Sequence, residues 1–257
     1  GGKTAWIRSD TLAVLGVHSD KYTGHGYDEW LINNVANIVD DDLNIGSAAL
    51  LRNGAQAFVQ IEPPATMTSK NGVKFRPFLG ACSSFDGSLA TTYKRGFTVW
   101  VCDNTMAAGL RENGEVFRVK HTKGSAMRIA DAREALDIVV EMSDDITAEL
   151  DKLVDQVVTD KEFAKLVDQL VPVPDGDGRG KTMAINKREE LTRLWVTDPR
   201  VAPWKGTAFG ALQAFNTHRH HLATVRNATR PERNMSNAIS GATATEDALV
   251  LATLNKV

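Results

Sequence analysis

The strongest constraint on the fold of this chain is a run of three strand-like segments separated by short turn signals. The segments cover residues 55–62, 74–84 and 89–102, and the second and third alternate in side-chain character. Asn53-Gly54 precedes the first segment, and Asp86-Gly87 separates the last two. Both dipeptides are typical of β-hairpin turns. The pattern therefore predicts three antiparallel strands in one sheet.

A short helix is expected directly after the third strand. Asp103 or Asn104 can cap its first turn, and Met106 and Leu110 are spaced four residues apart, as on one face of a helix. Together with the three strands, this helix makes a β-β-β-α unit over residues 55–110.

Helical periodicity dominates the chain after residue 125. Thr159 and Glu162 form a capping box, and Pro, Asp and Gly residues interrupt the pattern at 172–182. The predicted class is α+β, an antiparallel β-β-β-α core with flanking and C-terminal helices. The predicted division is a core at 1–171, a linker at 172–182 and a C-terminal helical region at 183–257. The predicted helices cover residues 126–142, 145–158, 163–170, 183–196 and 204–226.

The net charge of -2 conceals an uneven distribution of charge along the chain. Residues 51–133 contain 12 Lys and Arg against 6 Asp and Glu, whereas residues 134–171 contain 3 against 11. The positive charge is therefore concentrated where the strands are predicted, as expected for a surface that binds a polyanion.

Basic residues and an aromatic residue lie on or beside the predicted strands. Proteins that bind single-stranded nucleic acids place cations along the phosphates and stack bases on aromatic surfaces. The alternative is a solvated sheet face, because basic residues also protect edge strands from aggregation. The predicted nucleic-acid-binding residues are Arg52, Lys74, Arg76, Tyr93, Lys94, Arg95, Arg118, Lys120, His121, Lys123 and Arg128.

We predict no catalytic residue, no metal and no cofactor. Residues 175–182 end like a phosphate-binding loop, but Asp175 stands where the first Gly of that motif belongs. His218 and His221 are one helical turn apart, yet no Cys or carboxylate cluster accompanies them in the sequence. A solvated helix face or a nucleic-acid contact is therefore favoured there over a metal site.

A metal-dependent nuclease is the main enzymatic alternative, because such an enzyme needs converging carboxylates. Glu62, Asp86 and Asp103 are the candidates, and all three lie at predicted strand ends, where capping and turns also explain them. Cys82 and Cys102 lie in strand-like segments and are expected to be free thiols. The sequence has no run of about 18 apolar residues, so no membrane association is expected.

The chain carries three short motifs, Ser84-Phe85-Asp86-Gly87-Ser88, Val101-Cys102-Asp103-Asn104-Thr105 and Val119-Lys120-His121-Thr122. With these motifs it resembles, over residues 12–226, a phage- and plasmid-encoded family known chiefly as a domain of unknown function. The Trp-His-Gly-Leu-Gly-like segment that its members usually carry upstream is absent. The resemblance implies a mobile-element protein in the cytoplasm of a bacterial host.

The β-β-β-α order is also similar in fold to the phage single-strand annealing recombinases of the Red-beta and RecT type. That similarity implies a homo-oligomer, a ring or a filament, with single-stranded DNA along the basic strands. We therefore expect a phage-type protein that binds and anneals single-stranded DNA in recombination. The alternatives are the metal-dependent nuclease and a structural or host-interacting phage protein that does not bind DNA.

Overall fold

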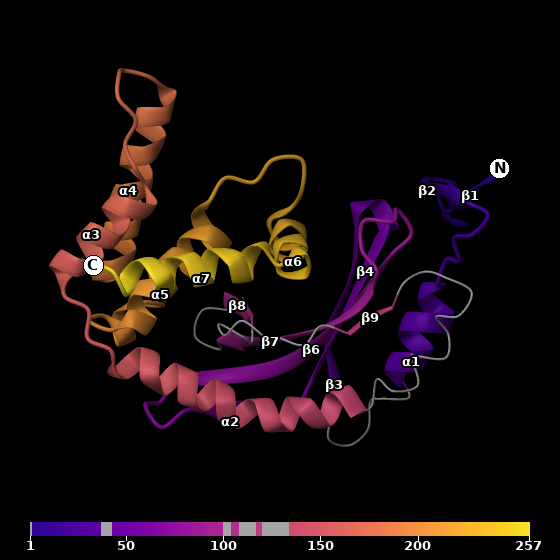
Figure 1. Ribbon diagram of the computed structural model, residues 1–257, viewed down its shortest axis with the longest axis horizontal. Helices are drawn as coiled ribbons and strands as arrows, with labels where there is room; N and C mark the ends of the chain where they lie inside the picture. Colours follow the sequence, from indigo (N-terminus) through magenta and orange to yellow (C-terminus); the bar gives the residue numbers. More distant parts are fainter. Residues whose placement is uncertain (1, 37–42, 100–103, 108–116, 120–133) are drawn as a thin grey trace. The chain divides into compact units, whose positions relative to one another are not determined.

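The computed structural model describes residues 2–36, 43–99, 104–107, 117–119 and 134–257 (Figure 1). It contains helices and antiparallel strands, which confirms the predicted α+β class. The chain forms two compact units. Unit 1 comprises Gly1–Thr66, Arg76–Phe97 and Arg111–Asp144, and unit 2 comprises Met67–Phe75, Thr98–Leu110 and Asp145–Val257.

The larger sheet has seven strands in the order β3-β4-β6-β7-β8, with β5 paired to β6 and β9 paired to β7. The β3–β4, β4–β6 and β7–β9 pairs are antiparallel. The predicted strand at 74–84 agrees with β6 at both ends. The strands are β3 (Asn44–Leu51), β4 (Gln56–Glu62), β5 (Met67–Thr68), β6 (Lys74–Ser84), β7 (Thr91–Val99), β8 (Asn104–Ala107) and β9 (Phe117–Val119).

The two predicted turns are confirmed. Asn53 and Gly54, between β3 and β4, have φ values of 56° and 96°, and Gly87, between β6 and β7, has a φ of 73°. Asn and Gly adopt this left-handed conformation at lower cost than other residues. The turn signals therefore mark the strand ends, although β3 itself is not among the predicted strands.

The short helix expected after the third strand is wrong. Asn104–Ala107 forms β8, next to β7 in the sheet. A helix of one or two turns leaves most of its backbone groups without partners, whereas a strand beside β7 gains inter-strand hydrogen bonds. Sheet pairing therefore outweighs the local capping signal, and the described part of the unit has no such helix.

The core of unit 1 lies between the sheet and a helical segment. That segment consists of a π-helical stretch, η1 (Tyr27–Ile32), followed by α1 (Asn33–Ala36). Alternate residues of β4 and β6 face it, as the two-residue period of a strand requires. The clustered side chains are Leu31, Val35, Ala57, Val59, Ile61, Leu79 and Ala81.

A separate hairpin, β1 (Lys3–Ile7) and β2 (Val14–Ser19), begins the chain. Two contacts attach it and the residues after it to the end of β6. His18 Nε2 lies 2.6 Å from the Phe85 carbonyl oxygen, and the Tyr22 hydroxyl donates to the Ser84 carbonyl at 2.9 Å. Four apolar residues of this hairpin are each more than half exposed: Ile7, Leu12, Val14 and Val17.

Unit 2 is mainly helical. Trp195 is buried and stacks on Phe163, with ring centroids 4.4 Å apart, and its Nε1 donates to Asp160 at 2.7 Å. The capping box of Thr159 and Glu162 is confirmed. α2 joins two predicted helices, while α6 and α7 occupy a tail for which no long helix is predicted. α2 (Glu134–Asp155) belongs to unit 1 up to Asp144 and to unit 2 from Asp145. The helices that follow it in unit 2 are α3 (Asp160–Leu170), α4 (Arg179–Thr197), α5 (Ala208–Thr217), α6 (Arg230–Ser240) and α7 (Ala242–Leu254).

Candidate nucleic-acid interface

The predicted nucleic-acid-binding residues fall into three groups. Arg52, Lys74 and Arg76 have described side chains. Tyr93, Lys94 and Arg95 lie on β7 and Arg118 lies on β9, where the backbone alone is described. The remaining four, Lys120, His121, Lys123 and Arg128, lie outside the described residues.

The pairing of β7 with β9 brings two parts of the predicted basic set together. Thr92 is paired with Arg118, and Tyr93 is paired with Phe117. Arg118 is therefore on the strand adjacent to Lys94 and Arg95, although it is more than twenty residues away in the sequence. A protein-bound phosphate chain needs this kind of side-by-side placement of cations.

Arg52 and Arg76 are ion-paired within the protein. Arg52 contacts Asp86 at 3.2 Å, and Arg76 contacts Glu62 at 2.6 Å. A guanidinium that already faces a carboxylate attracts a phosphate less strongly than an unpaired one. These two residues are therefore weaker candidates than the sequence alone indicates, whereas Lys74 is exposed on β6.

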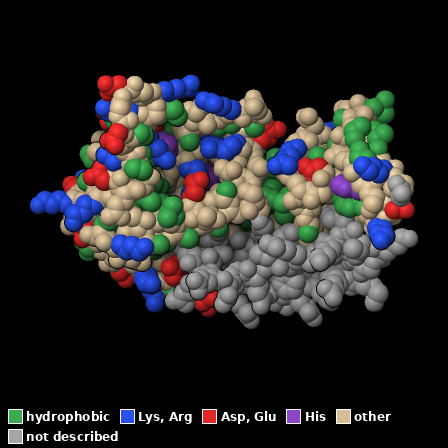
Figure 2. Space-filling view, turned by 45° about the horizontal axis from the view of Figure 1, so that its top comes forward, with side chains coloured by type: hydrophobic (Ala, Val, Ile, Leu, Met, Phe, Trp, Pro, Cys, Tyr) green, Lys and Arg blue, Asp and Glu red, His purple; other side chains and the backbone are tan. Residues whose placement is uncertain are grey.

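The face drawn in Figure 2 shows Lys and Arg side chains interspersed with Asp and Glu. They do not form one continuous basic band on that face of the described residues. Apolar side chains gather at the end where β1 and β2 lie, which agrees with the exposed apolar residues of the hairpin. At the β1–β2 end of this face, exposed apolar side chains are therefore as conspicuous as charged ones.

The carboxylates considered for a nuclease have other partners. Asp86 accepts from the Ser88 backbone N–H at 2.9 Å within the β6–β7 turn. Partial burial raises its pKa, but hydrogen bonds from Ser88, Ser84 and Arg52 outweigh that effect and lower it. Asp103 lies outside the described residues. Within the described part of the chain, no three His, Cys, Asp or Glu side chains gather as a metal site would require.

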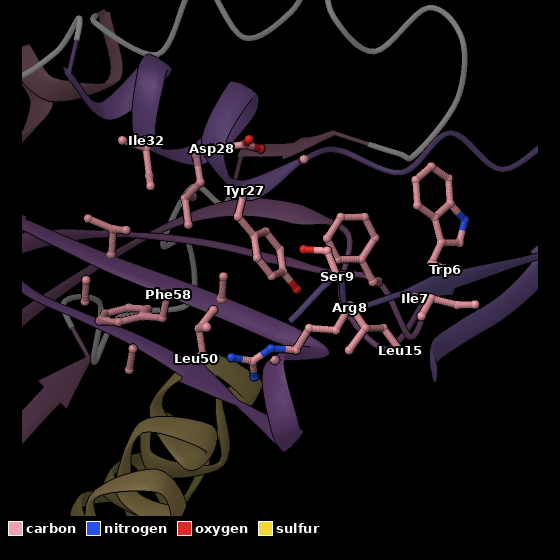
Figure 3. Close-up of a pocket in the computed structure, with 18 residues that line it drawn as sticks. Trp6, Ile7, Arg8, Ser9, Leu15, Tyr27, Asp28, Ile32, Leu50 and Phe58 are labelled. Atoms are coloured by element: carbon pink, nitrogen blue, oxygen red, sulfur yellow. The ribbon is translucent and has the colours of Figure 1, made fainter. Parts of the chain in front are cut away.

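An aromatic cavity of about 660 Å³ lies in unit 1 (Figure 3). Four rings line it: Trp6 of β1, Tyr27 of η1, Phe58 of β4, and Phe85 just after β6. The Phe85 ring centroid is 5.4 Å from that of Trp6, at an interplanar angle of 29°, and 4.7 Å from that of Tyr27. The cavity has the size and apolar lining of small-molecule sites, which run to about 300–1,000 Å³.

Trp6 Nε1, a buried polar atom of the aromatic cavity, has no hydrogen-bond partner among the described residues, whereas the buried Tyr27 hydroxyl has the Phe85 backbone as a partner. Burial, and then the charge of Asp86, raises the pKa of Tyr27, so its hydroxyl keeps its proton. A hydrogen bond with the Phe85 backbone offsets this rise of the Tyr27 pKa in part. An indole N–H can only donate. The cavity therefore offers the indole N–H of Trp6 as an unpartnered donor between aromatic walls.

Arg8 lies at the cavity below Tyr27 in the view of Figure 3, with its guanidinium extended toward Leu50. Its Nε and Nη2 donate to Asp10 at 2.6 and 2.8 Å, and its Nη1 donates to the Asn53 carbonyl at 3.1 Å. These bonds fix Arg8 beside the aromatic walls, but its charge already faces the Asp10 carboxylate, as those of Arg52 and Arg76 face theirs.

Sequence reasoning does not identify this cavity, because its rings come from four segments that are far apart in the chain. The signal that was available is Trp6, a large aromatic side chain on a short strand with exposed apolar neighbours. Its position beside Phe85 depends on how the β1–β2 hairpin attaches to β6, which no local pattern specifies.

The solvated helix face predicted around His218 and His221 is wrong for three of the four residues. His218, Arg219 and His220 are less than 9% exposed, and they begin a π-helical turn, η6 (His218–Leu222), that continues α5. His218 Nε2 lies 3.0 Å from Glu190 of α4. Most residues of α5 are buried, and η6 continues α5 without a break. The polar residues at the start of η6 therefore lie in the interior as well.

A known protein family matches most of the chain. A model described as a domain of unknown function, DUF932, matches residues 14–240. The chain belongs to the DUF932 family. The resemblance to a family of unknown function is thereby confirmed, and its link to phage recombinases stays a prediction. No curated protein and no solved structure matches this DUF932 chain. None of the helices in the described ranges is long and apolar enough to span a bilayer.

Proposed function

We propose that this DUF932 protein binds single-stranded DNA and anneals it as an oligomer in phage or plasmid recombination. The aromatic cavity is the observation that carries the proposal, because four rings and the unpartnered indole N–H of Trp6 suit an unpaired base. Bases in single strands expose both a stacking face and hydrogen-bonding edges. Duplex DNA hides these faces, so the cavity favours single strands.

The paired strands β7 and β9 supply the electrostatic part of the proposal. Lys94 and Arg95 on β7 and Arg118 on β9 lie in adjacent strands, within the most positive segment of the chain. Their cations would neutralise phosphates while the cavity takes a base. The annealing and oligomeric parts of the proposal come from the predicted resemblance alone, and particle sizing with and without DNA tests the oligomeric part.

Reversing charge on β7 is expected to weaken binding and its dependence on salt. We expect Lys94→Glu/Arg95→Glu to lose at least about tenfold in affinity for a labelled thirty-nucleotide single strand at low salt. The slope of log K against log salt should fall by roughly 1–2, because two phosphate contacts are removed. Fluorescence anisotropy over a salt series measures both quantities.

The matched control is Lys161→Glu/Lys165→Glu, which makes the same change in charge on exposed positions of α3. Equal losses in the two double variants would show that net charge alone governs binding. If the unchanged protein does not bind the labelled single strand at low salt, the proposed function is refuted. Particle sizing would then show whether the protein assembles, as a structural phage protein would, or is a monomer.

Removing the Trp6 ring is expected to weaken DNA binding without changing its salt dependence. Stacking of one base on an aromatic side chain contributes about 1–3 kcal/mol, so Trp6→Ala should lose roughly 5–150-fold in affinity with an unchanged slope. Trp6→Phe keeps a stacking ring and should retain most of the affinity. If circular dichroism shows that Trp6→Ala is folded and this variant binds DNA as tightly as the unchanged protein, the cavity is excluded as a base site.

A further inference from the structure

A short stretch of unit 2 carries a local excess of positive charge, where η6 leads through a loop into α6 (Figure 1). Residues 218–233 contain four Arg and a single Glu. The carboxylate of that residue, Glu232, accepts from the backbone N–H and the hydroxyl of Thr229 in the capping box of α6. The one acidic side chain of the stretch is therefore engaged at the start of α6 rather than with an arginine.

Two arginines of α6, Arg230 and Arg233, are held by backbone carbonyls at η6. Arg230 Nη1 donates to the Ala223 and His220 carbonyls at 3.0 and 3.4 Å, and Arg233 Nη2 donates to the Arg219 carbonyl. Since Arg219 and His220 are consecutive, the two guanidiniums lie side by side. A carbonyl oxygen is uncharged, so these bonds fix both groups in position without neutralising either charge.

Arg219, Arg230 and Arg233 form a cluster of like charges. Burial, and then the charge of Arg230, lowers the pKa of Arg233; Glu246 opposes this effect and Arg219 adds to it. Glu246 is itself ion-paired to Arg219 at 2.7 Å. Within the described ranges, neither Arg230 nor Arg233 contacts a carboxylate. Like charges held close together repel each other, so an anion that binds between them gains free energy.

The remaining donors of Arg230 and Arg233 define the class of that anion. A guanidinium has five N–H donors in a planar fork, and each of these two uses only one of its nitrogens on carbonyls. Both residues are partly exposed, so an anion can approach them from solvent. Such forks match the oxygens of a phosphate group, to which arginine makes paired hydrogen bonds. An oxyanion with several oxygens is therefore favoured over a halide.

We propose that Arg230 and Arg233 form an oxyanion-binding site on unit 2, and that its ligand carries a phosphate group. The site lies at the surface of η6 and α6 and needs no enclosed cavity, because the oxygens of the group make the contacts. It is separate from the aromatic cavity of unit 1 and does not rest on the proposed function. The phosphate belongs either to a small phosphorylated compound or to a nucleic-acid backbone, which share this chemistry.

Inorganic pyrophosphate is the probe for this site. The melting temperature and heat of binding of the full chain are measured with 1 mM pyrophosphate and with sodium chloride of equal ionic strength. We expect Tm to be about 2 °C or more higher in pyrophosphate, because a ligand that binds the folded chain stabilises it. The same Tm in both salts, with no heat of binding, would overturn the proposal.

Replacing both arginines locates the site. Arg230→Gln/Arg233→Gln should lose at least about tenfold in affinity for pyrophosphate, because both guanidiniums are removed. The matched control, Arg179→Gln/Arg193→Gln, removes the same charge from exposed positions of α4 and should keep the affinity. Equal affinities of the two double variants would assign the binding to net charge or to another site and would reject the proposal.

A second variant covers the case in which the Gln variant does not fold. Arg230→Lys/Arg233→Lys keeps both charges but loses the planar forks, so pyrophosphate affinity should fall by about three- to tenfold. An unchanged affinity would contradict a site built from guanidiniums.

Single-stranded DNA distinguishes the two sources of the phosphate. If the site takes a nucleic-acid backbone, Arg230→Gln/Arg233→Gln should lower the slope of log K against log salt by roughly 1–2. If it takes a small phosphorylated compound, this variant should lose pyrophosphate binding with the slope unchanged. Lys94→Glu/Arg95→Glu should keep pyrophosphate binding in either case, so failure of the proposed function and failure of this site are seen separately.

Discussion

Asp247→Ala is expected to lower the free energy of unfolding by about 3 kcal/mol. Asp247 is completely buried and ion-paired to Arg219, which is itself 9% exposed at its side chain. Removing one partner of a buried pair leaves a charge without compensation and typically costs about 3–5 kcal/mol. The lower end applies here, because Glu246 still contacts Arg219 at 2.7 Å. Urea unfolding followed by circular dichroism measures the loss.

Glu246→Ala is the matched control for this prediction. It removes the other carboxylate from the same guanidinium, but the Glu246 side chain is 57% exposed, so the expected cost is under about 1 kcal/mol. The double variant Arg219→Met/Asp247→Leu should recover most of the stability, because apolar residues often replace buried ion pairs without loss. Equal costs for the two single Ala variants would contradict the assignment of Asp247 as the buried partner.

Acid is expected to destabilise unit 2 through His220. Burial, and then the charges of Arg219, His221 and Arg233, lowers the pKa of His220 from 6.5 to about 3. As pH falls below 6.5, the unfolded chain therefore takes up a proton that the folded chain does not. The stability that neutral His220 contributes is present above about pH 7 and is lost progressively toward pH 3. The loss amounts to about 3 kcal/mol by pH 4.

The pH dependence of Asp247 has the opposite sign. Burial, offset in part by Arg219, raises its pKa from 3.8 to about 6, so the folded chain binds a proton first and gains stability as pH falls toward 4. The His220 contribution must therefore be isolated by difference.

Urea unfolding of the unchanged protein and of His220→Gln between pH 7 and 4 separates the two effects. The stability difference between the two proteins should shift by about 3 kcal/mol across this range, with the variant losing less. Parallel profiles would show that His220 does not titrate in the way its burial implies.

Several elements could be predicted because their signals are local. β6 agrees with the predicted strand at both ends, since alternation and the Asp86-Gly87 turn lie within that segment. The Thr159–Glu162 capping box also forms as predicted, because its bonds join residues three apart. Both signals need no partner from elsewhere in the chain.

Other elements could not be predicted, because a distant part of the chain decides their state. Residues 104–107 have a capping residue and helical spacing, yet they form β8 where pairing with β7 is available. The run from His218 to His221 has the composition of a solvated surface, but it continues α5 into the interior. In both cases a tertiary contact outweighs a local preference of the kind that sequence patterns report.

The sequence by itself determined the α+β class, the turns that divide the strands, and the concentration of positive charge on the strand region, because each depends on neighbouring residues or on composition. Only the tertiary structure decided which of those residues meet. It paired Arg52 and Arg76 with carboxylates, gathered Trp6, Tyr27, Phe58 and Phe85 around one cavity, and enclosed Asn216 with Asp247. Such contacts join residues far apart in the chain, and their geometry follows from packing rather than from any local period.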